Sequence, residues 1–260
     1  MIHQFAVVSP QAQLAQGVVV EQFSTIYEDV IIGENTKIGP NVVIYPGTRI
    51  GSNCEIFPGA VIGAVPQDLK FSGEYTTCEI GNNTVIRECV TIHRGTSDKM
   101  TTKIGNNCLL MGYVHVAHDC IIGNHVILAN YTGLSGHVTI EDFAILEGKV
   151  AAQQFVTIGA HAFVGGASLI RKSVPPFVRV AREPLSYIGV NSVGLRRRNF
   201  TDEQVRTIED IYRILFVQNS NVKKAVEIIE SAIPNSQEKQ QILNFIAQEE
   251  RGIVRGWVSE

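Results

Sequence analysis

The stretch IYEDVIIGENTKIGPNVVIYPGTRIGSNCEIFPGAVI, residues 26–62, repeats one pattern every six residues. A small or β-branched residue stands two positions before each isoleucine of the repeat, which occupies Ile26, Ile32, Ile38, Ile44, Ile50, Ile56 and Ile62. This period fits neither an α-helix nor a long strand, whereas two inward residues two positions apart are typical of a short strand. The stretch therefore predicts short strands separated by corners.

The same phase runs from Val8 to Ile170, and 24 of the 29 repeat positions from 8 to 176 hold Val, Ile or Leu. Three short sides would close a triangular coil of 18 residues, and coils stacked about 4.8 Å apart form a parallel β-helix. Glycine follows the aliphatic position at many corners, for example Gly33 and Gly51, and we expect a positive φ there. The pattern predicts an all-β solenoid.

The ladder of aliphatic residues is interrupted at Asp68, Glu74 and Asp98. We therefore predict loops inserted between coils near 64–77 and 94–101, because polar residues at these positions cannot face a dry interior.

From about residue 190 the hydrophobic spacing becomes helical, and Thr201 followed by Gln204 is a capping-box pattern. The predicted helices cover 201–218, 222–232 and 237–250. The sequence thus predicts a β-helix over 1–189 followed by a small α-helical C-terminal domain over 190–260.

Composition limits the possible partners of the 260-residue chain. A hydrophobic content of 45% allows a folded core, and the net charge of −3 provides no overall basic field for nucleic acid. Residues 171–198 nevertheless carry seven Lys or Arg against one acid. No apolar run approaches about 18 residues and no signal peptide is evident, so we expect a cytoplasmic protein without membrane insertion.

Most of the cysteines belong to the small inward column of the repeat. We expect these to be buried structural thiols rather than disulfides or a zinc site: Cys54, Cys78, Cys108 and Cys120. Cys89 falls outside the column.

Residues 18 apart stack in such a solenoid, and one outward column is suited to acyl transfer. His118, Gly136 and Gln154 follow one another in it, with His137 beside Gly136. His118 supplies a base, and the Gly136 N–H is open to an oxyanion. Asp119 could fix the histidine tautomer only if the chain turns between the two residues, because neighbours in a strand point to opposite faces.

Other interpretations of these polar residues stay open. Each histidine could be a solvated surface side chain. A metal site of His115, His118 and His137 is conceivable, but no carboxylate-supported three-histidine pattern stands out and we expect no metal.

Two further segments could bind a ligand or remain solvated. The inserted loop with Asp68 and Lys70 is exposed by construction. The run Arg196–Arg198 precedes a helix start, where guanidinium groups and free amides suit a phosphate.

Together, eight motifs carry a specific resemblance over nearly the whole chain: QDLK (67–70), TIHRGT (91–96), HVAHDC (115–120), LSGHV (134–138), QF (154–155), VGG (164–166), SVPP (173–176) and GVNSVGLRRRNF (189–200). The chain resembles the hexapeptide-repeat acyltransferases, and most specifically the acyl-carrier-protein:UDP-N-acetylglucosamine O-acyltransferases that start lipid A synthesis. The resemblance implies a left-handed coil and a homotrimer with active sites between subunits. It implies no cofactor beyond the phosphopantetheine of acyl carrier protein.

The resemblance also implies roles for individual residues. His118 would be the general base for the sugar 3-hydroxyl that attacks the acyl thioester, Asp119 would orient it, and the Gly136 amide would stabilise the oxyanion. Contacts with sugar, acyl chain, pantetheine or nucleotide phosphates are implied for Asp68, Lys70, His115, His137, Gln154, Arg197 and Arg198.

Two positions bear on the length of the acyl chain. Gly166 matches the position where the family measures the chain, and its lack of a side chain implies a long 3-hydroxyacyl group. Phe163 is a large residue near the expected end of that chain, and Gln153 stands where the family commonly has His. The basic excess would steer the acidic acyl carrier protein through Arg171, Lys172, Arg179 and Arg182.

Three alternatives differ in class. A sibling N-acyltransferase acting on an amino-sugar nucleotide usually has an extra N-terminal domain, whereas this repeat begins by residue 8. A metal-dependent carbonic anhydrase on the same scaffold would need a His-x4-His pair, which the sequence lacks. A silent scaffold would not need the base, amide and arginines together.

Overall fold

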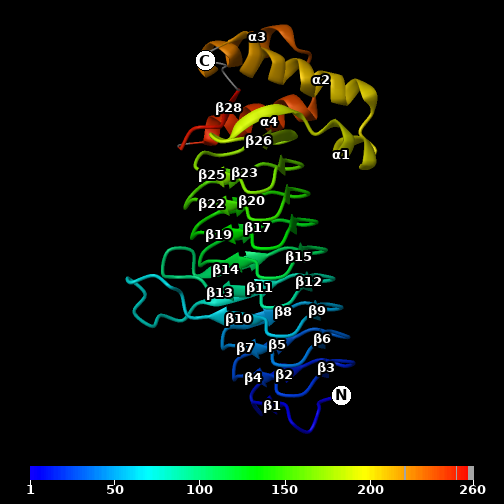
Figure 1. Cartoon of the computed structure of the whole chain (residues 1–260), viewed down its shortest axis with the longest axis vertical. Coiled ribbons are helices and arrows are strands. Elements are labelled where there is room, and N and C mark those ends of the chain that lie inside the picture. The colour runs from blue at the N-terminus through cyan, green and yellow to red at the C-terminus, as the bar shows by residue number, and fades with distance from the viewer. Residues whose placement is uncertain (220, 250, 257–260) are drawn as a thin grey trace.

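The computed structural model describes residues 1–219, 221–249 and 251–256. The chain winds upward as a column of stacked three-sided coils with a helical cap at its C-terminal end (Figure 1). Strands in successive coils pair in parallel, with partners 18 residues apart such as Val7 and Thr25. These features confirm the predicted solenoid.

Each side of the column is one parallel sheet. The first sheet contains β1 (Val7–Val8), β4 (Thr25–Ile26), β7 (Val43–Ile44), β10 (Val61–Ala64), β13 (Thr91–His93), β16 (His115–Val116), β19 (Gly133–Leu134), β22 (Ala151–Ala152) and β25 (Leu169–Ile170). The second contains β2 (Gln13–Leu14), β5 (Ile31–Ile32), β8 (Thr48–Ile50), β11 (Thr77–Ile80), β14 (Thr101–Ile104), β17 (Ile121–Ile122), β20 (Thr139–Ile140) and β23 (Thr157–Ile158).

The third sheet continues past the repeat into the C-terminal region. It contains β3 (Val19–Val20), β6 (Lys37–Ile38), β9 (Glu55–Ile56), β12 (Val85–Ile86), β15 (Leu109–Leu110), β18 (Ile127–Leu128), β21 (Ile145–Leu146), β24 (Phe163–Val164), β26 (Val178–Ala181), β27 (Ser186–Val190) and β28 (Arg255–Gly256). Among the strands that the structure describes, only β26 and β27 pair antiparallel. We name the corners by the sheets that they join: corner 1–2, corner 2–3 and corner 3–1.

The interior is the predicted ladder of aliphatic residues, which are buried along the column from Val20 to Val164. The four inward cysteines are free and buried, whereas Cys89 is exposed, as predicted. Burial raises the pKa of the Cys78 and Cys120 thiols to about 12.

The expected positive φ of the corner glycines is wrong for most of them. The left-handed residue lies two positions further on, as at Asn35 (φ 57°) and Asn53 (φ 56°), because Asn tolerates this conformation. The glycines are needed for space instead: a Cβ on Gly105 would lie 2.5 Å from the Gly123 carbonyl oxygen of the next coil.

Two loops project from one side of the column, between β10 and β11 and between β13 and β14 (Figure 1). Strand partners are 30 residues apart across the first loop (Val61 and Thr91) and 24 apart across the second (Thr91 and His115), instead of 18. The coil closes again after each loop, so the loops change the surface and leave the interior ladder intact.

The cap is formed by α1 (Ser192–Arg197), α2 (Asp202–Arg213), a π-helical turn (Ile214–Gln218), α3 (Val222–Ala232) and α4 (Gln237–Gln248). The three predicted helices are present: the first is α2 with the π-helical turn, the second is α3, and the last is α4, which ends at Gln248, whereas its predicted end at residue 250 lies outside the described residues. The Thr201–Gln204 capping box is formed at the start of α2. Fully buried Tyr212 donates a hydrogen bond to the Pro176 carbonyl oxygen (2.5 Å) and so anchors α2 to the last coil. Among the described residues no helix is long and apolar enough to cross a membrane.

Candidate active site

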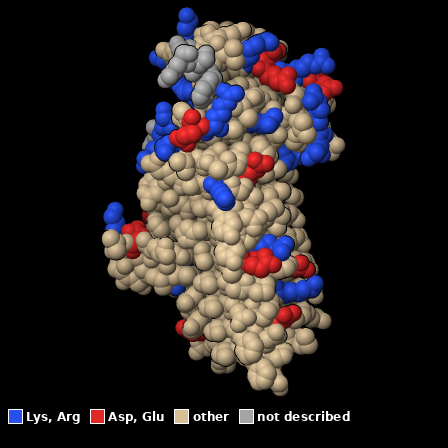
Figure 2. Space-filling view, viewed as in Figure 1, with Lys and Arg blue, Asp and Glu red and all other residues tan. Residues whose placement is uncertain are grey.

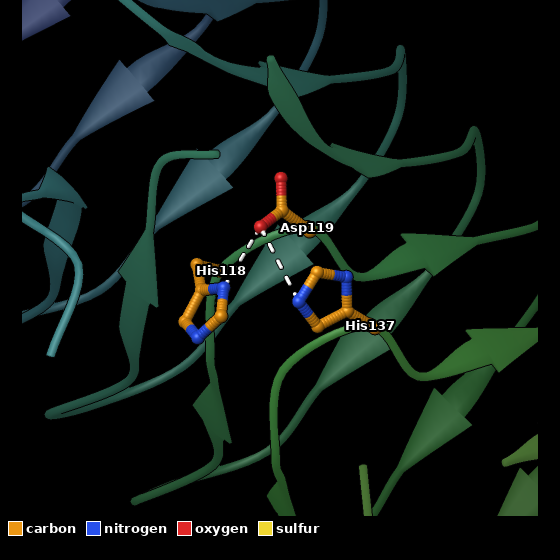
Figure 3. Close-up of side chains that lie close together, drawn as sticks. All are labelled: His118, Asp119 and His137. Atoms are coloured by element: carbon orange, nitrogen blue, oxygen red, sulfur yellow. Dashed lines mark hydrogen bonds and ion pairs between the residues drawn. The ribbon is translucent and has the colours of Figure 1, made fainter. Parts of the chain in front are cut away.

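His118 and Asp119 lie together at corner 1–2 (Figure 3). Asp119 has a φ of 59°, so the chain turns between the two residues and both side chains point the same way. His118 Nδ1 lies 2.8 Å from Asp119 Oδ2, and the side chains are 8% and 0% exposed. The left-handed corner thus supplies the turn that cooperation between adjacent residues requires.

The Asp119 carboxylate is held from several sides. Thr96 donates its backbone N–H to Oδ1 (2.9 Å) and its hydroxyl to Oδ2 (2.6 Å), and Thr102 Oγ1 accepts the Asp119 N–H (2.8 Å). Burial acts to raise the pKa of Asp119, but the hydrogen bonds from Thr96 and His118 outweigh it and lower the pKa below its ordinary value. An ionised Asp119 only accepts, so the His118 proton sits on Nδ1 and leaves Nε2 as the basic atom.

Gly136 lies directly beside the imidazole ring. A Cβ at this position would be 2.6 Å from His118 Cε1 and 2.7 Å from Nε2. Within the described chain the Gly136 N–H donates no hydrogen bond. A basic nitrogen and an unpaired amide therefore border the same space.

His137 follows Gly136 and lies above Asp119. Its Nε2 is 3.8 Å from Asp119 Oδ2, its ring is perpendicular to that of His118, and it stacks on Phe155 with ring centroids 4.4 Å apart. Burial lowers the pKa of His137. The loop residue Asp98 places Oδ2 3.1 Å from the other His137 nitrogen, Nδ1, without hydrogen-bond geometry.

His115 is in β16, the strand that leads into the corner of His118, and its side chain lies on the outer face of the first sheet. Thr91 Oγ1 is 2.8 Å from its Nδ1, and burial lowers its pKa. The ring of His93 meets it edge-on, with centroids 5.0 Å apart. Burial lowers the pKa of His93 to about 4, and the nearby His115 and His118 add to this effect.

The sequence reasoning missed both Thr96 and His93. Both belong to the motif TIHRGT (91–96), which contributed to the resemblance but received no role. The motif itself could have drawn attention to them.

A metal ion is sterically conceivable at His118, Asp119 and His137, whose ligand atoms lie within 4.8 Å of one another. This group differs from the histidine trio considered from the sequence, because it replaces His115 by a carboxylate. Asp119 Oδ2 already accepts from Thr96 and from His118 Nδ1. The carboxylate oxygen of this group is therefore already engaged in hydrogen bonds.

A pocket of about 320 Å³ opens between the two inserted loops and corner 1–2. Asp68 and Lys70 line it from the first loop, and His137 and Phe155 line it from the corner. Glu74 joins the loops, since its carboxylate accepts from Ser72 N–H (2.9 Å) and Ser97 N–H (3.0 Å). The structure thus brings three of the expected contact residues, Asp68, Lys70 and His137, to one cavity beside His118.

The remaining expected residues lie elsewhere. Gln154 is exposed at corner 1–2, one coil above Gly136. Arg198, at the end of α1, packs against corner 2–3 and donates to the Phe143 carbonyl oxygen there (3.1 Å). Neighbouring Arg197 is exposed and has no partner among the described residues. One chain alone does not bring these arginines to the base.

Gly166 and Phe163 lie near corner 3–1. The Gly166 N–H donates to Glu147 Oε2 (2.9 Å), and Gly166 is exposed. Phe163 is in β24, with the Arg179 guanidinium 5.9 Å from its ring centroid. The first sheet runs from this corner to corner 1–2, so Gly166 and His118 border the same outer face.

Comparisons with known proteins agree over the full chain. Residues 174–254 match the family model for domain 2 of UDP N-acetylglucosamine O-acyltransferase, and residues 29–64 and 101–136 match the model of six bacterial transferase hexapeptide repeats. An acyl-[acyl-carrier-protein]–UDP-N-acetylglucosamine O-acyltransferase from Sulfurihydrogenibium sp. is 53% identical over 97% of this chain and 93% of its own. The enzyme of that name from Thiobacillus denitrificans is 40% identical over 98% and 99%.

Solved structures are equally similar. The UDP-N-acetylglucosamine acyltransferase of Bacteroides fragilis superposes with a TM-score of 0.97 at 45% identity and covers 98% of this chain and 100% of its own. The fold is the left-handed parallel β-helix of hexapeptide repeats with a helical C-terminal region. The chain belongs to the acyl-[acyl-carrier-protein]–UDP-N-acetylglucosamine O-acyltransferase family.

Proposed function

We propose that the protein transfers a long 3-hydroxyacyl chain from acyl carrier protein to the 3-hydroxyl of UDP-N-acetylglucosamine, the first step of lipid A biosynthesis. The observation that carries the proposal is the oriented His118–Asp119 pair beside the unpaired Gly136 amide. Family membership favours this O-acyl transfer over N-acyl transfer to an amino sugar.

His118 Nε2 takes the proton of the sugar 3-hydroxyl while that oxygen attacks the thioester carbonyl. The carbonyl oxygen becomes negative, and the Gly136 N–H donates to it. When the intermediate collapses, the carbon–sulfur bond breaks and the pantetheine sulfur takes the proton from His118. The products are an ester and a free thiol, and the base is regenerated without any bound cofactor.

The substrates would be held by the residues around this pair. Asp68, Lys70 and His137 border the cavity beside the base and would contact the sugar. His115 and Gln154 would contact the acyl chain or pantetheine. These polar groups fix orientation, which is where much of the rate of a bimolecular transfer originates.

The separation of the arginines from the base supports a homotrimer with active sites between subunits. Arg198 donates to the Phe143 carbonyl oxygen at corner 2–3 and is preceded in the chain by exposed Arg197, whereas His118 occupies corner 1–2. In the assembly that we propose, the arginines of one subunit would bind the nucleotide phosphates at the base of its neighbour.

Acyl carrier protein, which is acidic, would approach the C-terminal end of the column. Lys and Arg gather over the cap and uppermost coils, and fewer charges lie on the coils below in the same view (Figure 2). Arg171 and Lys172 line a pocket of about 700 Å³ there. Such a field would raise the rate of association in a salt-dependent way. We place the reaction in the cytoplasm, where acyl carrier protein is available.

Chain length would be measured along the outer face between His118 and Gly166. Without a side chain, Gly166 leaves room for a long chain, and a bulky residue there would shorten the accepted group. Phe163 would limit how far the end of the acyl chain can extend.

A transfer assay tests the proposal. Purified protein, UDP-N-acetylglucosamine and a series of 3-hydroxyacyl carrier proteins from short to long are analysed by mass spectrometry. We expect product from long donors, and a loss of at least roughly a hundredfold in His118→Ala. His3→Ala removes a histidine at the N-terminal end of the column, several coils away from His118, and should behave as wild type. Product from no donor would refute the proposed reaction, and full activity of His118→Ala would refute the base.

A further inference from the structure

We propose that Thr96 is a positioning residue for the base: through Asp119 it fixes the orientation and charge that His118 meets. The proposal deepens the proposed function and rests on it for its kinetic consequences. Its structural basis is the short loop between β13 and β14, which the repeat pattern identifies only as an insertion.

Three consecutive residues of this loop contact three different parts of the site. Thr96 binds Asp119 through both its N–H and its hydroxyl. Ser97 donates its N–H to Glu74 of the other inserted loop, and Asp98 lies against His137. The loop therefore joins the support of the base to the wall of the substrate pocket.

The Thr96 hydroxyl has a defined direction. Asp119 is ionised and can only accept, so the hydroxyl hydrogen points to Oδ2, while Thr96 Oγ1 accepts the Asp98 N–H (3.4 Å). Thr96 is 6% exposed, which excludes water as a ready substitute.

Thr96 and His118 share one carboxylate oxygen. Asp119 Oδ2 is 2.6 Å from Thr96 Oγ1 and 2.8 Å from His118 Nδ1. The hydrogen bond from the threonine hydroxyl thus weakens the negative potential that Oδ2 exerts on His118. The weakened potential still stabilises the imidazolium that forms during the reaction. The carboxylate also cannot rotate away from the ring while both Thr96 donors hold it.

The substitution Thr96→Val removes the hydroxyl at nearly constant volume and keeps the backbone N–H. Without the shared hydrogen bond the full charge of Oδ2 acts on the imidazole and favours its protonated form, so the NMR titration of His118 in the variant should move to higher pH than in the wild type. The looser carboxylate should lower kcat roughly tenfold at an unchanged KM for the sugar nucleotide. Thr96→Ser keeps the hydroxyl and should restore both values.

The first measurement is an NMR titration of the unliganded protein with ¹³Cε1-labelled histidine, with the His118 resonance assigned by its absence in His118→Ala. We expect the titration of Thr96→Val to be displaced and that of Thr96→Ser to match wild type. Because no substrate is present, this result does not depend on the proposed reaction. An undisplaced titration in Thr96→Val would overturn the proposal.

A double-mutant cycle with Asp119→Asn separates positioning from general damage. If Thr96 acts through Asp119, Thr96→Val lowers kcat in the wild-type background and has little further effect in Asp119→Asn. Equal losses in both backgrounds would show a merely structural role. Should valine prevent folding, Thr96→Cys, a weaker donor of similar size, should give an intermediate titration shift and kcat, and wild-type values would count against the proposal. Absence of transfer by the wild type would refute only the proposed reaction.

Discussion

At the residue scale, the position of the proposed base His118 depends on the absence of a side chain at Gly136. The His118 ring lies against residue 136, and its Cε1 atom is only 2.6 Å from the position that a Cβ of residue 136 would take. The ring cannot move aside without breaking its 2.8 Å contact with Asp119. Gly136 therefore serves the base by leaving space, in addition to offering its amide.

We expect Gly136→Ala to fold but to lose roughly a hundredfold in kcat, because the methyl group displaces the imidazole. Gly133→Ala is the matched control in the same coil, since nothing lies within 4 Å of a Cβ there. Steady-state transfer rates and circular dichroism compare the two variants. Equal activity of both alanine variants would contradict the proposed crowding.

The spacing of the repeat was sufficient to bring His118, Gly136 and Gln154 to one corner, because residues 18 apart stack. It could not place Thr96, which lies in an inserted loop where that spacing does not apply. It also could not decide whether Asp119 faces its neighbour, because this depends on one left-handed φ.

At the element scale, a ladder of polar side chains runs up the start of corner 2–3. Each accepts the backbone N–H of the residue one coil below, at 2.7–2.9 Å, from Ser52 upward: Asn82, Asn106, Asn124 and Asp142. The last rung is a carboxylate. These hydrogen bonds join corner 2–3 of one coil to corner 2–3 of the next, in addition to the backbone hydrogen bonds between the strands of successive coils.

We expect Asn82→Ala to lower the free energy of unfolding by about 1 kcal/mol, because the Ser52 N–H loses its acceptor and only water replaces it. Asn82→Asp retains an oxygen at the same place and should keep most of the stability. Urea unfolding of the three proteins measures the difference. An unchanged midpoint for the alanine variant would show that the rung contributes nothing.

The six-residue aliphatic period was enough to predict the strands and the buried column, and the change to helical spacing was enough to predict the helices that follow Thr201. The expected positive φ of the corner glycines was wrong for most of them. Sequence alone does not show that neighbouring coils lie too close together for a Cβ at these positions. The polar ladder was missed for a related reason: its hydrogen bonds join residues 18 or more apart, and their geometry depends on how the coils stack.

At the scale of the whole molecule, the column separates His118 from the C-terminal arginines that we propose to act with it. His118 lies at corner 1–2, whereas Arg198, next to Arg197 in the chain, contacts corner 2–3, and in the proposed trimer each active site would draw the base and the arginine from two chains.

Mixed trimers test this arrangement. His118→Ala and Arg197→Ala should each be impaired alone, whereas trimers that mix the two chains should recover about one third of the wild-type transfer, because one of their three interfaces unites an intact base with an intact arginine. Differently tagged chains allow the mixed species to be purified and assayed. If each site were formed within one chain, the mixed species would stay as impaired as its parents.

The buried thiols have a consequence for how the column comes apart. Cys54, Cys78, Cys108 and Cys120 are spread along the interior, and each is shielded from solvent while its own coil is closed. An alkylating reagent reaches such a sulfur only when that coil parts from its neighbour. The order in which these four sulfurs are alkylated under mild destabilisation therefore shows from which end the solenoid unfolds, and no probe residue has to be introduced.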